Sequence, residues 1–425
     1  MKCVIIGGGA AGMAAALFLA EAGADVRVLE QNEKLGKKLF ITGKGRCNFT
    51  NACDVDGLLS HVVTNPRFLY SSFYGWDSKQ TIDLFEKLGV KTKVERGNRA
   101  FPASDHSSDI IRALEKRLRE KGVSISLRTK VSEILADTDT DGKEKIKGVL
   151  LSDGTEIPAD AVVVATGGLS YPTTGATGDG YRFAEKTGHR IDSCRPALVP
   201  LVTQEDYIPK MQGLSLRNVT LRIHCGKKKE FKEFGELLFT HFGISGPLAL
   251  SASSYIGSAL EENQKNGRNG LSASLDLKPA LTEKQLDDRL LREFGEAKNK
   301  EFKNVIPGLF PASLRPVMLE LSGIPGEKPV REITKEERKR FIGLIKSFPF
   351  TITGTRGYNE AIITQGGVSV RDVNPSTMES RRVSGLYFAG EVLDLDGVTG
   401  GYNLQIAWAT AHTAAEGILK NQPPS

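Results

Sequence analysis

The opening stretch of the chain, residues 1–30, constrains the fold more than any other part of the sequence. It reads as an apolar strand, a glycine turn, a helix, a second apolar strand and a terminal acid, Glu30. Gly7, Gly9 and Gly12 stand at the G-x-G-x-x-G spacing, which allows a tight turn, close approach of a diphosphate to the backbone, and close contact between helix and strand. The stretch predicts a dinucleotide site in preference to a glycine turn with a purely structural role.

Two chemical features of this unit indicate which dinucleotide it binds. The helix begins near Ala10 and Ala11, and its first amides lack acceptors within the helix, so an anionic diphosphate is stabilised there. Glu30 is placed to accept hydrogen bonds from ribose hydroxyls. Because its carboxylate would repel a 2′-phosphate, FAD or NAD is favoured over NADP.

The length and composition of the chain indicate an ordinary globular protein of more than one domain. A chain of 425 residues is long for one core, which favours two or three domains. The net charge of +6 is small for this size and comes from dispersed Lys and Arg, so we expect no nucleic acid partner. No apolar run approaches the roughly 20 residues that span a bilayer, and we expect no membrane association.

The five cysteines favour a reducing compartment. Their number is odd and no C-x-x-C pair occurs, so disulfides, a bound metal and a thioredoxin-like redox pair are not expected. The apolar N-terminus superficially resembles a signal peptide, but glycines interrupt it and no convincing cleavage site follows. We therefore expect a cytoplasmic protein.

A second glycine-rich stretch, TGKGRCNFTN, lies at residues 42–51. Gly43, Gly45, Arg46 and Asn48 can present backbone and side-chain N–H groups to a phosphate or to a ring system. The alternative is a mobile, solvated basic loop. The density of glycines favours ligand contact.

The next part of the chain alternates predicted helices and strands. Amphipathic helices are predicted at residues 80–88 and 108–121, and an alternating strand at residues 123–135. Asp153 and Gly154, between two apolar runs, predict a hairpin turn.

A continuous apolar run at residues 161–165 suits a buried parallel strand. It delivers Thr166, Gly167 and Gly168 to the carboxyl edge of the sheet, where open α/β folds bind ligands. Asp179 then lies in a T-G-D-G stretch that opens a helix. It is either an acid favoured by the helix dipole or part of a second ligand loop, and both interpretations stay open.

The character of the sequence changes at about residue 191, where antiparallel strands begin. Strands are predicted within residues 198–203, 216–225, 236–250 and 271–279, with a basic hairpin, CGKKKEF, at residues 225–231. Thr282 and Thr334 each begin a T-x-x-E/Q capping box followed by a helix with one apolar face. The apolar residues of these faces are Leu286, Leu290, Leu291 and Phe294 in the first helix, and Phe341, Leu344 and Ile345 in the second.

The closing stretch returns to the opening fold. Residues 386–389 read as a strand added to the first sheet, and Gly390 and Glu391 follow it at the sheet edge. Gly400 and Gly401 then precede a helix whose N-terminus can point at another electron-rich part of the ligand. The predicted fold is α/β: a discontinuous Rossmann-like domain at residues 1–190 and 355–425, an inserted β-barrel-like domain at 191–280 and 347–354, and a small helical domain at 281–346.

Four stretches together resemble one family of flavoproteins. TGKGRCNFTN, FTHFGISGP, TQGGV and GEVLDLDGVTGGYNLQIAWATA are similar to the BaiN/RdsA-like flavoproteins, also called the aminoacetone oxidase family. That family lies within the larger FAD-binding group of glutathione reductase and fumarate reductase. The likeness extends over essentially the whole chain and implies FAD as the cofactor, with a β-barrel and a helical bundle inserted into the FAD-binding domain.

The resemblance also implies which residues contact FAD. Glu30 and the first glycines hold the ADP half, with Val131 beside the adenine; residues 43–48, Gly390 and Glu391 hold the diphosphate and ribityl chain; residues 401–405 approach the pyrimidine end of the flavin. With the sheet-edge residues, the expected set is Gly7, Gly9, Ala10, Ala11, Gly12, Glu30, Gly43, Gly45, Arg46, Cys47, Asn48, Val131, Thr166, Gly167, Gly168, Asp179, Gly390, Glu391, Gly400, Gly401, Tyr402, Asn403, Leu404 and Gln405.

Two departures from glutathione reductase bear on the electron donor. The chain has no second G-x-G-x-x-G, and Cys47 and Cys53 are one residue too far apart for a C-x-x-x-x-C pair. A dedicated nicotinamide domain is therefore not expected. The resemblance implies that hydride passes from a small amine-type substrate to flavin N5, with reoxidation by oxygen or another acceptor.

Oxidising an amine also requires a base, and His241 is the best candidate among the histidines because it joins a strand to a glycine turn. A histidine that satisfies a hydrogen bond in the barrel is the alternative. Arg46, Tyr171, Arg356 and Asn403 are further candidate site residues. Two other functions stay open: a reductase of unsaturated or steroid-like compounds using external NAD(P)H, and an FAD-holding RNA-modification or sensor protein. The sequence leaves the oligomeric state open.

Overall fold

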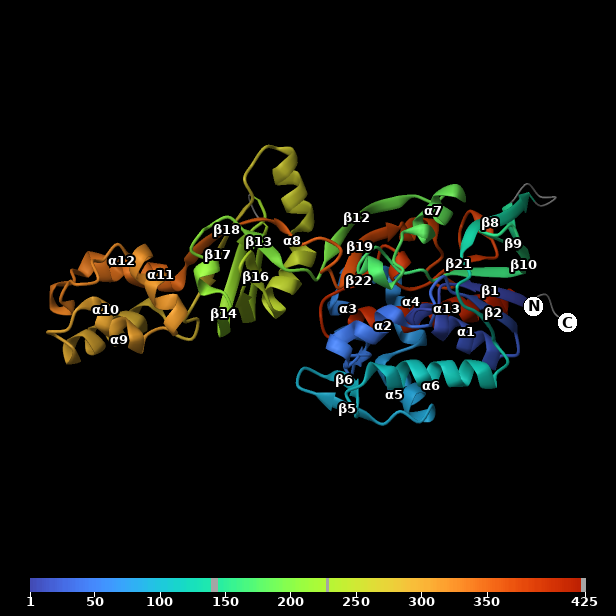
Figure 1. Ribbon diagram of the computed structural model, residues 1–425, viewed down its shortest axis with the longest axis horizontal. Helices are drawn as coiled ribbons and strands as arrows, with labels where there is room; N and C mark the ends of the chain where they lie inside the picture. The colour runs from blue at the N-terminus through green and yellow to red at the C-terminus, as the bar shows by residue number, and fades with distance from the viewer. Residues whose placement is uncertain (139–143, 227–228, 422–425) are drawn as a thin grey trace. The chain divides into compact units, whose positions relative to one another are not determined.

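The computed structural model describes residues 1–138, 144–226 and 229–421. These divide into two compact units, the first formed by Met1–Ala197 with Gly357–Ser425 and the second by Leu198–Arg356 (Figure 1). The first unit contains both the blue N-terminal and the red C-terminal segments of Figure 1. The dinucleotide fold is thus assembled from the two ends of the chain.

A five-stranded parallel sheet lies at the centre of the first unit, in the order β21-β11-β1-β2-β7. Its strands are β1 (Lys2–Ile6), β2 (Asp25–Leu29), β7 (Ser124–Ser126), β11 (Ala161–Val164) and β21 (Leu386–Phe388). The strand predicted near residue 386 is confirmed, and it extends the sheet beside β11. Helix α1 (Ala10–Glu21) contacts α13 (Tyr402–Lys420) and α6 (Ser107–Glu120), so the first and last helices of the fold are neighbours.

The single alternating strand predicted at residues 123–135 is wrong. The chain turns at Arg128, whose φ is +53°, and its amide donates to the carbonyl of Asn32. Strand β7 therefore stays in the parallel sheet, while β8 (Val131–Thr138) pairs with β9 (Glu144–Leu151) in a separate antiparallel sheet. That sheet also contains β10 (Glu156–Pro158) and β20 (Val383–Ser384). The hairpin turn between β9 and β10 is confirmed, with Gly154 at φ +89°.

The remaining elements of the first unit surround these two sheets. They are α2 (Lys37–Ile41), β3 (Thr50–Asn51), α3 (Val55–Ser60), β4 (Val62–Thr64), α4 (Tyr70–Gly75), α5 (Ser78–Lys87), β5 (Thr92–Glu95), β6 (Arg99–Pro102), α7 (Asp179–Lys186), β12 (Ile191–Ala197), β19 (Ile363–Val368) and β22 (Asp396–Gly397). The helices predicted near residues 80 and 108, and the helix opened by Asp179, are confirmed. Strand β12, expected in the insert, pairs with β19 inside the first unit.

The second unit begins with a closed antiparallel barrel in the order β13-β16-β15-β14-β17-β18. Its strands are β13 (Leu201–Thr203), β14 (Ser215–His224), β15 (Glu230–Phe239), β16 (Gly243–Ser245), β17 (Leu271–Asp276) and β18 (Phe348–Thr355). The predicted strand at residues 236–250 ends early, because Pro247 starts helix α8 (Pro247–Lys265) after Gly246 turns the chain at φ +85°. Proline is favoured at a first helical position. Of the predicted CGKKKEF hairpin, Lys227 and Lys228 lie outside the described residues.

A helical part completes the second unit: α9 (Glu283–Glu296), α10 (Phe302–Val305), α11 (Arg315–Ser322) and α12 (Lys335–Lys346). Both predicted capping boxes are present, at Thr282 and at Thr334. Leu291 was assigned to the buried face of α9 but is 47% exposed, because it lies five residues beyond the buried Leu286 and so well round the helix. The buried faces of these helices share one hydrophobic core with the barrel, which includes Phe341 and Phe348.

Two features of the described residues bear on function. No helix among them is long and apolar enough to cross a membrane. No group of three or more His, Cys, Asp or Glu side chains within the described ranges could hold a metal ion.

Candidate functional site

A long cleft in the first unit follows the carboxyl ends of the parallel strands. It encloses about 1420 Å³ of empty space, part of it open to solvent, and all of its lining residues belong to the first unit. Ligands bind at this edge of open α/β sheets. The predicted residues that line it are Gly7, Gly9, Ala10, Ala11, Glu30, Val131, Thr166, Gly167, Gly168, Asp179, Glu391, Asn403 and Leu404.

The turn between β1 and α1 leaves room for a diphosphate at one point only. A Cβ on Gly7 would lie 2.5 Å from the carbonyl oxygen of Ala165, and a Cβ on Gly12 would lie 1.9 Å from that of Gly7. A Cβ on Gly9 would meet nothing within 4 Å. Gly9 also caps α1 without a side-chain acceptor, so the first amides of the helix are left for an anion at the cleft.

Glu30 is held in place at the end of β2. Its side chain is 8% exposed, and it lines the cleft. Its Oε2 accepts a hydrogen bond of 2.7 Å from the amide of Gly8, and its Oε1 accepts one of 2.8 Å from the amide of Asn32. The carboxylate is therefore oriented by backbone amides, as a fixed acceptor for ribose hydroxyls requires.

A second charged group in the cleft escaped the sequence reasoning. Lys38 on α2 donates to both carboxylate oxygens of Glu391, at 2.9 and 2.6 Å, and to the Ser170 hydroxyl at 2.5 Å. Glu391 also accepts from the amide of Thr364 at 2.8 Å. This network joins four distant segments beside the N-terminus of α1, since a Cβ on Gly390 would lie 2.7 Å from that of Ala11. No spacing rule in the sequence links these residues.

A buried polar atom without a hydrogen-bond partner bears on whether the site fits FAD. Thr166 Oγ1 is such an atom, and Thr166 lines the cleft. Buried polar atoms in native proteins are normally hydrogen-bonded, so such atoms mark places where a ligand or water completes the structure. Together with the open approach at Gly9 and the fixed carboxylate of Glu30, the Thr166 hydroxyl fits a bound dinucleotide that extends along the cleft.

Several predicted residues do not reach the cleft, for identifiable reasons. Gly12, Gly390 and Gly401 lie where neighbouring segments pack too closely for a side chain. For example, a Cβ on Gly401 would lie 2.4 Å from the backbone of Thr50. Gln405 is fully buried, and its amide bonds to Thr50, Thr81 and Trp76. Cys47 is also fully buried, which raises the pKa of its thiol. Gly43, Gly45, Asn48, Gly400 and Tyr402 are likewise absent from the cleft lining, and Tyr402 stacks on His61 at 4.4 Å.

Arg46, predicted both to bind the cofactor and to take part in catalysis, is instead paired at the surface. Its guanidinium lies 2.5 Å from Glu95 and 2.6 Å from Asp105, and it stacks on Phe101 at 4.2 Å. Hydrogen bonds to these carboxylates raise the pKa of Arg46, and their negative charges balance its positive charge. The group therefore stabilises the loop that carries it and is not directed at the cleft.

The other catalytic candidates are divided between the two units. Tyr171 belongs to the first unit, with φ +54° and an amide that donates to Tyr358. His241 and Arg356 belong to the second unit, where His241 contacts the edge of Phe242 at 5.0 Å and Arg356 lies over that ring at 4.6 Å. Asn403 lines the cleft, and it both donates to and accepts from the backbone of Gly397.

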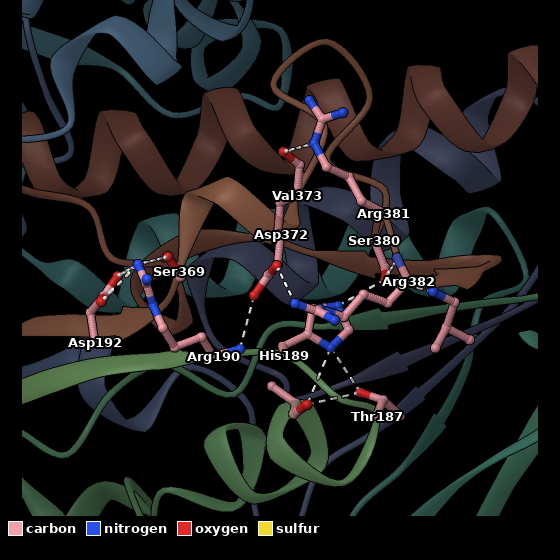
Figure 2. A network of polar contacts seen from close by, with 12 residues as sticks. Thr187, His189, Arg190, Asp192, Ser369, Asp372, Val373, Ser380, Arg381 and Arg382 are labelled. Atoms are coloured by element: carbon pink, nitrogen blue, oxygen red, sulfur yellow. Dashed lines mark hydrogen bonds and ion pairs between the residues drawn. The ribbon is translucent and has the colours of Figure 1, made fainter.

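Figure 2 shows a network around a different histidine, His189, which is 4% exposed. Its Nε2 lies 2.8 Å from the Ser380 hydroxyl, and its Nδ1 lies 3.0 Å from the Thr187 hydroxyl. Asp372 accepts from the amide of Arg190 and from the guanidinium of Arg382. Burial lowers the pKa of His189. None of these residues lines the cleft, so the network supports the fold.

An acid that the sequence did not reveal lies next to the cleft. Asp396 is fully buried and follows Leu395, which lines the cleft. The amide of Gln365 donates to it at 3.1 Å. Burial raises the pKa of Asp396 to about 6, so this carboxyl takes up a proton at a higher pH than an ordinary aspartate does.

Comparison with known proteins places this site in a family. The family described as HI0933-like protein Rossmann domain matches residues 1–417. The chain is 33% identical to the 3-dehydro-bile acid delta(4,6)-reductase of Clostridium scindens, covering 96% of this chain and 97% of that protein. It is 34% identical to the ribosomal RNA dihydrouridine synthase of Haemophilus influenzae, covering 98% of each.

Solved structures agree on the fold. The 3-ketosteroid delta1-dehydrogenase of Sterolibacterium denitrificans superposes with a TM-score of 0.53 over 99% of each chain at 14% identity, which shows the fold alone. The cleft, the family match and the flavoprotein relatives agree on FAD as cofactor and on flavin-dependent oxidoreduction as the general activity. The chain belongs to the HI0933-like family of Rossmann-fold, FAD-binding oxidoreductases.

Proposed function

We propose that this protein is a flavin-dependent reductase of a carbon–carbon double bond conjugated to a carbonyl group. The observation that carries the proposal is that two relatives matching over nearly their whole length are named for this chemistry. The bile acid relative is named for reducing double bonds of a 3-oxo compound, and dihydrouridine is uridine with two hydrogens added to its ring double bond. Their shared chemistry replaces amine oxidation as the favoured reaction.

The chain's own residues support such a reaction by holding the cofactor and a proton. Bound FAD would supply hydride from its reduced flavin to the carbon remote from the carbonyl. The other carbon then needs a proton from an acid. Asp396, whose pKa burial raises to about 6, follows a residue of the cleft wall and is one candidate acid, and His241 is the candidate in the second unit.

Two substrates of this class are candidates: a small enone and a uridine within RNA. The distribution of positive charge along the chain supports RNA as the second candidate substrate. Residues 198–356 contain 25 Lys and Arg against 19 Asp and Glu, so the inserted unit carries the whole net charge of +6 of the chain. Electrostatic attraction to phosphates dominates nucleic acid affinity. The earlier expectation of no nucleic acid partner therefore stays untested.

The test uses reduced protein prepared by photoreduction, which requires no assumption about the natural donor. It is mixed anaerobically with a 3-oxo-4,6-diene steroid or with a short uridine-containing RNA, and the return of oxidised flavin absorbance is followed. We expect one of these acceptors to reoxidise the flavin rapidly and to gain two hydrogens by mass spectrometry.

The contrasting arm mixes oxidised protein with aminoacetone, NADH or NADPH. Rapid bleaching by aminoacetone, together with no reoxidation by either conjugated acceptor, would reject the reductase in favour of an amine oxidase. Bleaching by a nicotinamide would identify the electron donor, although the chain has no second G-x-G-x-x-G to hold it.

A further inference from the structure

We propose that residues 171–178 form a strap that closes the adenosine end of the FAD site, and that Gln31 and Asn32 latch it to the end of β2. The proposal goes beyond the substrate chemistry and concerns how the protein takes up and retains its cofactor. It assigns roles to two side chains that neither the glycine motif nor the candidate catalytic set includes.

The strap faces the ribose-binding side of the cleft. Residues 174–178 line the cleft on one side, and Glu30, Gln31, Asn32 and Val131 line it at the end of β2 and the start of β8. A ligand whose ribose bonds to Glu30 is therefore bordered by the strap. Ala176, in the middle of this segment, is only 9% exposed.

Two amide side chains tie the strap to β2. Gln31 Nε2 donates to the carbonyl of Gly175 at 2.7 Å, and Asn32 Nδ2 donates to the carbonyl of Thr174 at 3.0 Å. Both bonds join residues more than 140 positions apart in the chain. The strap is also held at its start, where the amide of Tyr171 donates to Tyr358, and at its end, where the carbonyl of Gly178 accepts from the amides of Tyr181 and Arg182 in α7.

Asn32 links the strap to the ribose acceptor itself. Its Nδ2 also donates to Glu30 Oε1 at 2.7 Å, and its backbone amide donates to the same oxygen at 2.8 Å. Because a carboxylate oxygen accepts about two hydrogen bonds, Oε1 is filled by Asn32. Oε2 receives one bond, from Gly8, and retains capacity for a ribose hydroxyl. Asn32 is thus a positioning residue for both the carboxylate and the strap.

The backbone of the strap is built to turn at its two ends and at the latch. Tyr171, Gly175 and Gly178 have φ of +54°, +97° and +78°, the left-handed region that favours glycine. A Cβ on Gly175 would lie 2.4 Å from Asn32 Nδ2. The latch therefore requires glycine at position 175, both for the backbone and for the approach of the amide.

The latch hydrogen bonds join protein atoms only, so they oppose opening of the strap both when FAD enters and when FAD leaves. Weakening them should accelerate FAD release and also FAD entry, whereas loss of a direct FAD contact would accelerate release alone. Gln31 separates these cases, because its side chain donates to the strap carbonyl of Gly175 and Glu30 is oriented by other residues.

The experiment measures FAD release from the holoprotein by recovery of flavin fluorescence on dilution, and rebinding by stopped flow to apoprotein from the same sample. For Gln31→Ala we expect both rates to rise about 3- to 10-fold, the factor for one lost neutral hydrogen bond. Asn32→Ala should raise release further because Glu30 also loses its orientation. Gly175→Ala should accelerate both rates by displacing the latch.

Asn263→Ala is the matched control. Asn263 donates to the carbonyl of Gly270 at 2.9 Å within the second unit, so both FAD rates should equal those of the parent. Release and rebinding at parental rates in Gln31→Ala would overturn the strap. Faster release with unchanged rebinding would also overturn it, because the side chain would then add affinity without gating.

Discussion

At the residue scale, two buried acids that look alike in the sequence have different partners and different rises in pKa. Asp396 and Asp394 lie two positions apart in LDLDG, yet Asp396 is fully buried beside Gln365, and Asp394 accepts from Asn65 at 2.8 Å. Burial raises the pKa of both carboxyls, and that of Asp396 to about 6. The raised value means that the folded protein binds a proton at Asp396 where the unfolded chain has released it.

This gives a pH prediction for Asp396. Between about pH 4 and pH 6 the folded state binds more protons at this site, so its contribution to the free energy of unfolding falls as pH rises. We expect Asp396→Asn to remove this dependence and to raise stability at pH 7 relative to pH 4.5 by at most about 3 kcal/mol, the equivalent of about two pKa units. Urea unfolding at the two pH values measures it. Asp56→Asn, at an exposed position, is the control, and an equal change in both variants would contradict the prediction.

At the element scale, two glycines of one motif have different roles where α1 follows β1 and packs closely on it. Gly12 has no room for a side chain, because its Cβ would lie 1.9 Å from the carbonyl oxygen of Gly7. Gly9 has room in the protein, and a methyl there would occupy only the approach to the diphosphate. The motif therefore combines a fold requirement with a binding requirement.

We expect the two alanine variants to separate these requirements. Gly12→Ala should destabilise the first unit by about 1–3 kcal/mol or more, as overpacking does, and so lower its melting temperature. Gly9→Ala should keep the melting temperature of the apoprotein but bind FAD more weakly. Thermal melting and titration of apoprotein with FAD measure the two effects. Equal loss of stability in both variants would contradict the assignment.

At the scale of the whole molecule, the FAD cleft and the insert belong to separate compact units. Every residue that lines the cleft belongs to the first unit, and Ala197 pairs with Ile363 beside the point where the insert leaves and returns. The helical part of the insert is joined to the barrel, because Lys346 forms an ion pair with Asp276 at 2.6 Å and the apolar helix residues share one core with the barrel. The insert is therefore best removed whole.

Replacing residues 198–356 with a short Gly-Ser bridge should leave a folded unit that binds one FAD per chain but has lost turnover. Flavin absorbance of the purified variant and the reoxidation assay measure the two properties. Replacing only residues 281–346 is the informative comparison, since it exposes the apolar barrel core and should give insoluble protein. Loss of flavin from the variant lacking 198–356 would show that the insert is needed for the cofactor site.

The sequence by itself determined the features that depend on short separations along the chain. The glycine motif, the Asp153-Gly154 hairpin and the capping boxes at Thr282 and Thr334 each lie within a few residues, and local hydrogen bonding and backbone conformation decide them. Helix α8 was missed because a short apolar run such as that at residues 247–250 suits a strand or a helix equally.

Tertiary structure alone decided which polar groups meet. The pairing of Lys38 with Glu391 spans 353 positions and the latch of Asn32 on Thr174 spans 142, so no local pattern could reveal either. In the fold Arg46 pairs with Glu95 and Gln405 is fully buried, which no local pattern indicates. The physical reason is that a charged or amide side chain takes whichever partner the fold brings within hydrogen-bond distance, and the fold, not the neighbouring sequence, sets that distance.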